Sequence, residues 1–528
     1  MKRCPECRRD YYDDKLFFCL DDGSALLEGP ASFGGEKTAV IPHFGFVGEA
    51  ATISYQSSIQ TAENSNSIAV LPLANLSGDP ANEYLSDGIS EELLNVLSKI
   101  RGLRVAARTS AFSFKGKPTT ITEIGSILNV AYVLEGSIRI AGNRIRVSVQ
   151  LEDVEFGYQL WSETYDRSLD DMFAVQDDIA GSVVEELRTR LTGEAVDSRE
   201  AQRIETEVAV AAMGRAADPE AQRLLLLGRY FLDRTNREDA EKAIAYFRQA
   251  VELDPGFALG WAELGRAYCV AAGKNWAPLA RGYEQARESI NRALEIEPDL
   301  AEGHALLGRV RSAYDLDVPG AARSYEQALL LAPGNPVVRD GASILEFKLG
   351  RLERALELSR SVVEQDPLSA AVWHNLGMIS HSAGLLAEAG SAFRRALELT
   401  PSRLLTNAML SIVLLDQGSP DTALQQSAAE PDEFWRMWAQ AIIYHAAGKI
   451  ADSDAILANL TENYGDGDSY QIAEICAARG EADKTFEWLE RAISERDPGI
   501  SHANVSPRFR NLHSDERWDE LMARIGLS

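Results

Sequence analysis

Three cysteines and one aspartate near the start of the sequence have the spacing of a metal site. Cys4, Cys7, Cys19 and Asp22 read C-x2-C-x11-C-x2-D, and Asp21 is an alternative to the fourth ligand. Zn²⁺ takes four tetrahedral ligands, mostly thiolates, and two short turns can bring such groups to one ion. Metal binding would also supply the folding free energy that a segment with almost no apolar core lacks. The sequence therefore predicts a structural zinc ion, with a metal-free remnant as the alternative.

A second group of candidate residues is three arginines that recur in the tripeptide Leu-Gly-Arg. Arg229, Arg266 and Arg309 each follow the same Leu-Gly pair. Guanidinium groups in a row could hold an acidic or carboxyl-terminated peptide by bidentate, charge-assisted hydrogen bonds. Alternatively, they pair with carboxylates of the same chain, such as Glu263 or Glu302, and offset its negative charge. Both interpretations stay open at the level of the sequence.

The sequence lacks the motifs of several common enzyme classes. It has no glycine-rich loop before a lysine strand, no H-R-D or D-F-G element, no phosphate-binding loop and no H-E-x-x-H pair. Its seven histidines are scattered, and cores or solvated faces explain them better than a metal site does. We therefore expect a protein without catalytic activity, whose function lies in its surfaces.

The arginines lie in a long region with an internal repeat. Five prolines recur at steps of 43, 35, 34 and 34 residues, namely Pro255, Pro298, Pro333, Pro367 and Pro401. In the best copy, seven residues fit the frame W-x2-L-G…A-x3-F-x2-A-x4-P: Trp373, Leu376, Gly377, Ala389, Phe393, Ala396 and Pro401. This frame resembles the tetratricopeptide repeat, a pair of antiparallel helices that stacks into a solenoid. We expect about eight units over residues 217–498 and a helical cap over residues 499–528, because terminal units must cover their apolar faces.

The resemblance to tetratricopeptide repeats implies that this region binds a protein or peptide. In that family, the residue after the small residue of the first helix tends to face the concave groove. The resemblance therefore implies that Arg229, Arg266 and Arg309 form a ladder in the groove, where the partner would be acidic.

Residues 67–192 differ from the repeats, with short apolar runs, amphipathic helices and a turn at residues 141–143. Alternating residues on both sides of that turn predict a β-hairpin. The segment resembles the TolB-like amino-terminal domain family on motifs that include Ser67–Pro72, Tyr84–Gly88, Tyr132–Ser137 and Leu160–Arg167. The resemblance implies an α/β fold with a mixed sheet and a bacterial regulatory or scaffolding role. Members often follow a kinase, cyclase or winged-helix domain, which this sequence does not contain, and residues 193–216 are expected to be a helical connector.

The segment before this domain is expected to hold a small module and a linker. Residues 1–28 resemble a zinc ribbon, although ribbons of this kind usually carry cysteine where this chain has Asp22. Five basic and seven acidic side chains fall within residues 1–30, which favours a structural or docking module over a nucleic-acid reader. Residues 29–66 are rich in Gly, Ser, Thr and Asn, so a flexible linker is expected there.

The composition of the whole chain indicates where the protein is located and which classes of partner it is expected to bind. The 528 residues carry a formal net charge of −27, which disfavours binding to nucleic acid or to anionic membranes. No apolar run approaches the roughly 18 residues of a membrane-spanning helix, and no signal-peptide pattern follows Met1. Five cysteines do not suggest a disulfide framework, and Cys269 and Cys476 are expected to be buried free thiols in repeat helices. We therefore predict a cytoplasmic location.

The sequence as a whole predicts a multidomain protein without enzymatic activity. A small zinc ribbon, an α/β mixed-sheet domain and an all-α solenoid would together form an adaptor or regulatory scaffold that binds protein partners. One alternative is a signalling or transcription regulator whose ribbon contacts nucleic acid, which would show a steep salt dependence of binding. The other is a ligand-binding or enzymatic pocket in residues 67–192, which a ligand-induced rise in stability would reveal.

Overall fold

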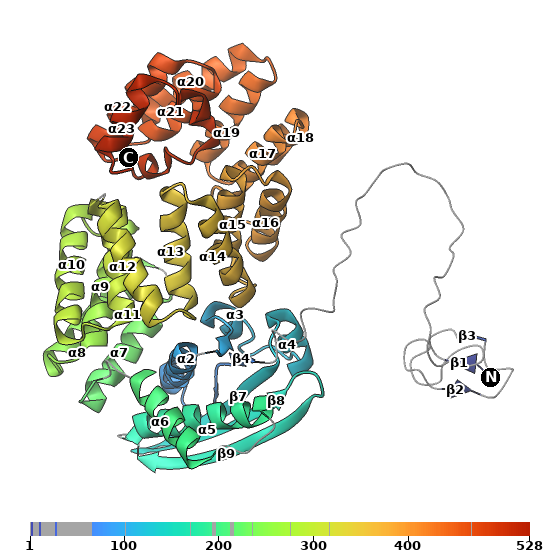
Figure 1. Ribbon diagram of the computed structural model, residues 1–528, viewed down its shortest axis with the longest axis vertical. Coiled ribbons are helices and arrows are strands. Elements are labelled where there is room, and N and C mark those ends of the chain that lie inside the picture. Colours follow the sequence, from blue (N-terminus) through green and yellow to red (C-terminus); the bar gives the residue numbers. More distant parts are fainter. Residues whose placement is uncertain are drawn as a thin grey trace. The chain divides into compact units, whose positions relative to one another are not determined.

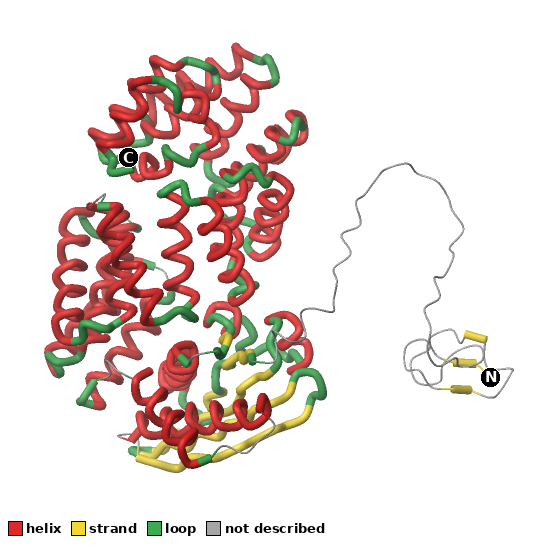
Figure 2. The backbone as a smooth tube through the Cα atoms, in the orientation of Figure 1, coloured by secondary structure: helices red, strands yellow, loops and turns green. Residues whose placement is uncertain are grey.

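The computed structural model describes residues 2–3, 10–11, 27–28, 66–100, 102–168, 171–192, 197–211, 216–234, 236–274, 276–315, 317–465 and 467–527. The chain divides into two compact units, Met1–Ser57 and Ser58–Ser528. In the first unit, strands β1 (Lys2–Arg3), β2 (Asp10–Tyr11) and β3 (Leu27–Glu28) form an antiparallel sheet in the order β2-β1-β3. Figures 1 and 2 show the second unit, in which strands give way to helices along the chain.

The second unit begins with a mixed sheet of six strands, as expected for residues 67–192. The strands are β4 (Ser67–Val70), β5 (Ala74–Asn75), β6 (Arg104–Val105), β7 (Tyr132–Ala141), β8 (Arg144–Asp153) and β9 (Tyr158–Ser168). Their order is β6-β4-β7-β8-β9, and β5 also pairs with β7. Pairing is parallel among β4, β5, β6 and β7 and antiparallel from β7 through β9.

The hairpin predicted around residues 141–143 joins β7 to β8. Gly142 adopts φ +60° in its turn, a backbone conformation that glycine tolerates without strain. Along β8 the apolar residues alternate inward, and Ile145, Val147, Val149 and Leu151 are all buried. This period of two places one face of β8 on a core and leaves its other face polar.

Helices pack on both faces of this sheet, since Leu134 belongs to one apolar cluster and Val133, on the opposite face, belongs to another with Ile124 and Leu128. The helices are α2 (Glu83–Lys99), α3 (Arg108–Phe112), α4 (Ile121–Leu128), α5 (Met172–Thr192) and α6 (Ser198–Ala211), with the short η1 (Pro80–Asn82) before α2. Side chains of α2 and α5 share one apolar cluster with β7 and β8. Helix α6 lies within the connector that the sequence predicted for residues 193–216.

The rest of the chain is helical and built from successive antiparallel pairs. The helices are α7 (Pro219–Leu232), α8 (Arg237–Leu253), α9 (Ala258–Gly273), α10 (Leu279–Ile296), α11 (Ala301–Val310), η3 (Arg311–Asp315), α12 (Val318–Leu331), α13 (Pro336–Lys348), α14 (Leu352–Gln365), α15 (Ala370–Ser382), α16 (Leu386–Leu399), α17 (Thr406–Asp416), α18 (Pro420–Ser427), α19 (Glu433–Ala446), α20 (Ile450–Tyr464), α21 (Ser469–Ala478) and α22 (Ala482–Glu495). The first helices of the pairs, α7 through α21, contact one another in succession. We call the side that they form the inner row.

Small residues of the repeat frame allow the two helices of a pair to approach closely. A Cβ atom at Gly228 of α7 would lie 2.4 Å from the ring of Phe247 on α8. At Gly377 of α15 it would lie 2.7 Å from the ring of Phe393 on α16. Both phenylalanines are fully buried, so each Gly–Phe contact fixes the packing of its pair.

The last elements close the end of the solenoid and cross back over it. They are η4 (Pro498–His502), η5 (Pro507–Leu512) and α23 (Glu516–Arg524). Trp518 and Leu521 of α23 share an apolar cluster with Phe486 and Leu489 of α22. Of the helices in the described ranges, none has the length and hydropathy needed to cross a membrane.

Candidate functional site

The inner row has a half that is covered by the α/β domain. Helix α2 packs along α7, and Gly88 lies so close to Leu226 that a Cβ atom there would come within 2.7 Å of its methyl carbons. Farther along, Lys99 at the end of α2 pairs with Glu302 of α11 at 3.2 Å. We call the surface from α7 to the loop after α14 the covered half.

A second set of contacts joins the α/β domain to the loop after α14. Ser110 of α3 donates a hydrogen bond to Asp366 at 2.6 Å and accepts one from the backbone N–H of Leu368 at 2.9 Å. The N–H of Ala107 donates to the carbonyl of Gln365 at 2.7 Å. These groups are separated by more than 250 residues in the chain, so they anchor the α/β domain to a distant repeat.

Buried ion pairs hold the centre of the covered half. The guanidinium of Arg229 on α7 binds Glu92 of α2 and lies 3.0 Å from Glu263 of α9 and 3.7 Å from Glu91 of α2. Burial would lower the pKa of Arg229, but the carboxylates of Glu263, Glu91 and Glu92 raise it well above its ordinary value. Arg266 donates to Glu263 at 2.6 Å. The charges therefore compensate one another inside the contact between domain and repeats.

The same cluster extends to α3 and to the residue after α7. Arg108 lies 3.0 Å from Glu91 and 2.8 Å from Asp233, so one guanidinium bridges the α/β domain and the first repeat. Burial raises the pKa of Asp233, although the nearby Arg108 opposes that rise. The network thus includes residues of α2, α3, α7 and α9.

The three arginines predicted from the Leu-Gly-Arg tripeptide lie in different surroundings. Arg229 is 4% exposed inside the ion-pair cluster, and Arg266 shares Glu263 with it. Arg309 on α11 is exposed. Of the two carboxylates that the sequence offered as internal partners, Glu263 pairs with both Arg229 and Arg266, whereas Glu302 pairs with Lys99. Binding of a peptide by these arginines remains a prediction.

The metal ligands predicted from the sequence cannot be placed in the fold. Cys4, Cys7, Cys19 and Asp22 lie outside the described residues. The two cysteines of the repeat helices are described, and Cys269 and Cys476 are buried free thiols, as predicted. Burial raises the pKa of each thiol to about 11, so neither is a reactive thiolate at neutral pH.

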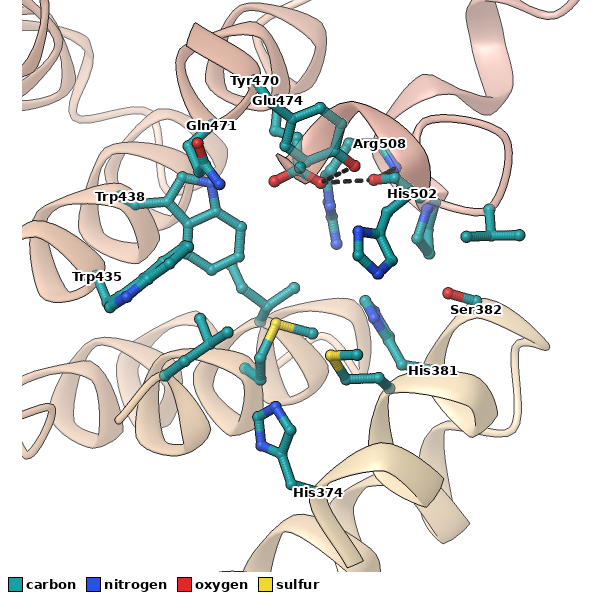
Figure 3. Close-up of a pocket in the computed structure, with 18 of the residues that line it drawn as sticks. His374, His381, Ser382, Trp435, Trp438, Tyr470, Gln471, Glu474, His502 and Arg508 are labelled. Carbon is teal, nitrogen blue, oxygen red and sulfur yellow. Dashed lines mark hydrogen bonds between the residues drawn. The ribbon is translucent and has the colours of Figure 1, made fainter. Parts of the chain in front are cut away.

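The inner row continues into an open half that contains a pocket of about 430 Å³ (Figure 3). Its walls come from α13, α15, α17, α19 and α21 and from residues 498–508, which follow the last repeat. Apolar and aromatic side chains form most of the lining, among them Phe347, Met378, Met409, Trp435 and Trp438. A pocket of this size, whose apolar lining also carries polar and charged side chains, has the character of a ligand or peptide site.

Residues 498–512, here called the C-terminal strap, close one side of this pocket. Arg508 of the strap forms an ion pair with Asp416 of α17, and Arg510 donates to the backbone carbonyl of Ser382 on α15. His381 of α15 also lies 2.7 Å from Asp416. Although burial would raise the pKa of Asp416, His381 and Arg508 hold it below its ordinary value. The strap is therefore tied to α15 and α17 by charged groups.

Burial shifts the pKa values of three other titratable groups of the pocket toward their neutral forms. Burial raises the pKa of Glu474 on α21 to about 7, and Ser506 of the strap donates to this carboxyl group at 2.7 Å. Burial lowers the pKa of His374 and of His502 to about 3. His374 Nδ1 lies 2.9 Å from the hydroxyl oxygen of Thr406. At neutral pH the two imidazoles are uncharged, and Glu474 is near its midpoint.

Sequence reasoning did not identify this pocket. His374 and His381 had been assigned to cores or solvated faces, which fits their burial but not their place in a pocket wall. The lining residues belong to five helices and a strap spread over 160 residues, so no single window of sequence contains them. One local signal is the pair Trp435 and Trp438 on α19, which both line the pocket.

Known protein families and individual proteins are similar to parts of this chain. Family models described as tetratricopeptide repeat match residues 342–403 and 235–257. The chain contains tetratricopeptide repeats, and these two segments lie in α13–α16 and α8.

Two curated relatives show how partial the similarity is. Over 198 residues the chain is 42% identical to a protein named putative adenylate cyclase 3 of Rhizobium meliloti (strain 1021), covering 38% of this chain and 32% of that protein. It is 28% identical over 269 residues to cellulose synthase 2 operon protein C of Komagataeibacter xylinus, covering 47% of this chain and 19% of that protein. The chain thus spans a third or less of the length of these relatives.

Solved structures of low sequence identity resemble the repeat region. They include pilF of Pseudomonas aeruginosa, with 21% identity, a TM-score of 0.33 and coverage of 42% of this chain and 96% of that one. Another is YrrB, described as a TPR protein with an unusual peptide-binding site, with 20% identity, a TM-score of 0.29 and coverage of 37% and 97%.

Proposed function

We propose that this protein is a non-enzymatic scaffold that binds a segment of a partner protein in the pocket of its open half. The observation that carries the proposal is the contrast within the inner row, where one half holds the α/β domain and the other half presents a pocket of about 430 Å³. The proposal keeps the cytoplasmic location that the sequence predicts.

The covered half supports this proposal because it is a case of polypeptide recognition within the same chain. Its helices hold a folded surface through ion pairs, a close Gly88–Leu226 contact and hydrogen bonds to backbone groups. The inner row continues without a break from α13 into the pocket. The open half therefore has the scaffold for recognition of a second polypeptide surface.

The pocket itself supports a partner with apolar side chains. Trp435 and Trp438 meet edge to face at 5.9 Å between ring centroids, and both line the pocket. Aromatic and methionine side chains dominate the binding energy of many protein interfaces because they bury a large apolar area. An apolar side chain of the partner would displace water from these surfaces.

The test is a selection of random peptides displayed on their own mRNA against the full-length protein. Enriched peptides are then titrated by fluorescence anisotropy against wild type, the pocket variant Trp435→Ala and the control Trp261→Ala. Trp261 is also a half-buried tryptophan of a first helix, but it does not line the pocket. The proposal predicts that Trp435→Ala weakens binding at least tenfold and that Trp261→Ala does not. A selection without enriched peptides, or equal loss in both variants, contradicts it.

A zinc ion in the amino-terminal unit is a separate proposal. We infer from the spacing of Cys4, Cys7, Cys19 and Asp22 that the ion would be structural, since thiolates on two short turns suit tetrahedral Zn²⁺. Elemental analysis of the untagged protein is expected to find one zinc per chain and less after Cys19→Ser. Zinc binding that is absent at neutral pH would contradict the proposal.

A further inference from the structure

Four buried side-chain atoms of the pocket lining have no hydrogen-bond partner within the described part of the chain, namely Nε of Arg403, Nε of Arg508, Nε1 of Trp438 and Oε1 of Gln471. Two of them belong to uncharged side chains: the indole of Trp438, a residue 4% exposed, and the amide of Gln471, a residue 9% exposed. Native proteins pair nearly all such groups, so each unpaired one calls for an explanation. Figure 3 shows both side chains on the same side of the pocket, from α19 and α21.

The two groups have complementary chemistry. The Trp438 indole is a hydrogen-bond donor, and the carbonyl oxygen of Gln471 is an acceptor. One peptide group offers both partners, because its C=O can accept from the indole and its N–H can donate to the amide oxygen. The backbone of a polypeptide therefore fits this side of the pocket better than a hydrocarbon ligand does.

Arg403 supplies a positive charge on another part of the pocket lining. It precedes α17, and no ion pair or side-chain hydrogen bond of its guanidinium occurs among the described residues, where its buried Nε also lacks a partner. Burial lowers the pKa of Arg403, and its charge contributes to the low pKa of His374. By contrast, Arg508 in the same pocket is neutralised by Asp416. Arg403 thus has no carboxylate partner among the described residues of the pocket.

Apolar side chains also line the pocket. They include Met378 of α15, Leu405 just before α17, Met409 and Ile412 of α17, and Trp435 of α19. Methionines adapt to side chains of different shapes, so this surface accepts more than one apolar residue. A suitable ligand combines a peptide group, an apolar side chain and a carboxylate.

We propose that the pocket binds the carboxyl-terminal end of a partner polypeptide whose last residue is apolar. The terminal carboxylate would bind Arg403, the last side chain would contact Met378 and Met409, and a peptide group near the end would bind Trp438 and Gln471. This inference rests on the proposed function and names the partner of the same site. The arginine that binds the carboxylate would then be Arg403 and not one of the three Leu-Gly-Arg arginines for which the sequence suggested such a peptide.

The experiment uses fluorescein-labelled heptapeptides that share a Gly-Ser spacer and end in Phe, Leu, Met, Ala or Ser. Each is made as the free acid and as the carboxyl-terminal amide, and binding to the full-length protein is measured by fluorescence anisotropy. We expect the acids ending in Phe, Leu or Met to bind at least tenfold more tightly than their amides, because a charge-assisted pair with Arg403 is lost in the amide. Acids ending in Ala or Ser are expected to bind more weakly.

Two variants and a control locate the interaction. Arg403→Gln should reduce the affinity for the acid at least tenfold and leave the affinity for the amide unchanged. Trp438→Phe, which keeps a ring but removes the indole N–H, should weaken the acid and the amide by the same factor of about two to ten. Arg323→Gln, at an exposed arginine of α12 outside the pocket, should change neither. Circular dichroism and thermal melting verify that each variant is folded.

The outcomes separate this inference from the proposed function. Equal affinity for acid and amide, with loss of both in Trp435→Ala, overturns the carboxyl-terminal end and leaves the scaffold proposal standing. Binding of acids that Arg403→Gln does not reduce also overturns the inference. If none of the five acids binds, the inference is wrong, and the random-peptide selection alone then decides the proposed function.

Discussion

The two halves of the inner row use one repeat frame for different kinds of contact. In the covered half, the residue after the small glycine is an arginine, and Arg229 and Arg266 take part in a buried ion-pair cluster with carboxylates of α2 and α9. In the open half the equivalent residue is Met378, which lines the pocket. This position of the frame therefore carries charged side chains in the covered half and an apolar side chain on α15 of the open half.

The difference also concerns how the charged side chains are paired. In the covered half, Arg229, Arg108 and Lys99 all have carboxylate partners across the contact. In the open half, Arg403 has no ion pair among the described residues. A surface that folds against its own domain can satisfy its charges during folding, whereas a surface for a partner leaves a charge to be satisfied on binding.

The largest effect is expected from breaking the ion-pair cluster of the covered half. Arg229→Met leaves the carboxylate of Glu92 without its buried partner and leaves Glu263 paired with Arg266 alone, so the α2–α7 contact should lose about 3–5 kcal/mol. Native-state hydrogen exchange measures this as a lower free energy of opening for the amides of α2. The matched change Arg309→Met affects an exposed arginine after the same Leu-Gly pair and should cost less than about 0.5 kcal/mol. Equal effects of the two changes would show that the cluster contributes nothing specific.

The next largest effect is expected in the open half, where the carboxyl group of Glu474 makes the stability of the protein depend on pH. The pKa of Glu474 rises from 4.5 to about 7 on folding, so the native state binds the proton more tightly than the unfolded state does. Stability from this group is therefore complete below pH 4.5 and is lost as the pH rises to about 7, by about 3 kcal/mol at 1.4 kcal/mol per pH unit.

Comparing wild type with Glu474→Gln separates the contribution of Glu474 to stability from that of other titrating groups. His374 and His502 have lowered pKa values, so their contribution makes the protein more stable as the pH rises. Urea unfolding at pH 5, 6, 7 and 8 is expected to show the advantage of wild type over Glu474→Gln shrinking as the pH rises. A difference that stays constant across this range would mean that the carboxyl group is not held neutral between α21 and the strap.

A smaller effect is expected from the close contact between α2 and α7. Gly88→Leu places a side chain against Leu226, where even a Cβ atom would come within 2.7 Å, and should cost about 1–3 kcal/mol. Gly181→Leu on α5 is the matched control, because nothing lies within 4 Å of a Cβ atom there. It should be neutral or stabilise the helix by up to about 1 kcal/mol. Thermal melting of both variants makes the measurement, and a Gly88→Leu protein as stable as the control would place α2 away from α7.

The repeats could be predicted from the sequence because their signals are local. Prolines at a period near 34, small residues at helix contacts and apolar residues three and four apart all report on neighbouring helices. Gly448 and Gly480 follow α19 and α21 with φ of +73° and +76°, the left-handed conformation that favours glycine at the end of a helix. The hairpin at Gly142 followed from alternation and turn chemistry in the same way.

The docking of the α/β domain and the pocket could not be predicted, because their contacts join distant parts of the chain. Ser110 meets Asp366 across 256 residues, and Arg229 meets Glu92 across 137. The sequence offered Glu263 and Glu302 as partners for the arginines, and Lys99 takes Glu302 instead because α2 extends to α11. No pattern in one sequence states which carboxylate a folded domain will bring to a given arginine.

In the proposed scaffold, a partner binds the open half while the α/β domain stays on the covered half. Hydrogen exchange followed by mass spectrometry, with and without a saturating peptide from the random selection, measures both halves at once. We expect new protection in α15, α17, α19, α21 and the C-terminal strap, with α2, α7 and α9 unchanged. Faster exchange of α2 and α7 on peptide binding would show instead that the partner displaces the α/β domain, which contradicts the proposal.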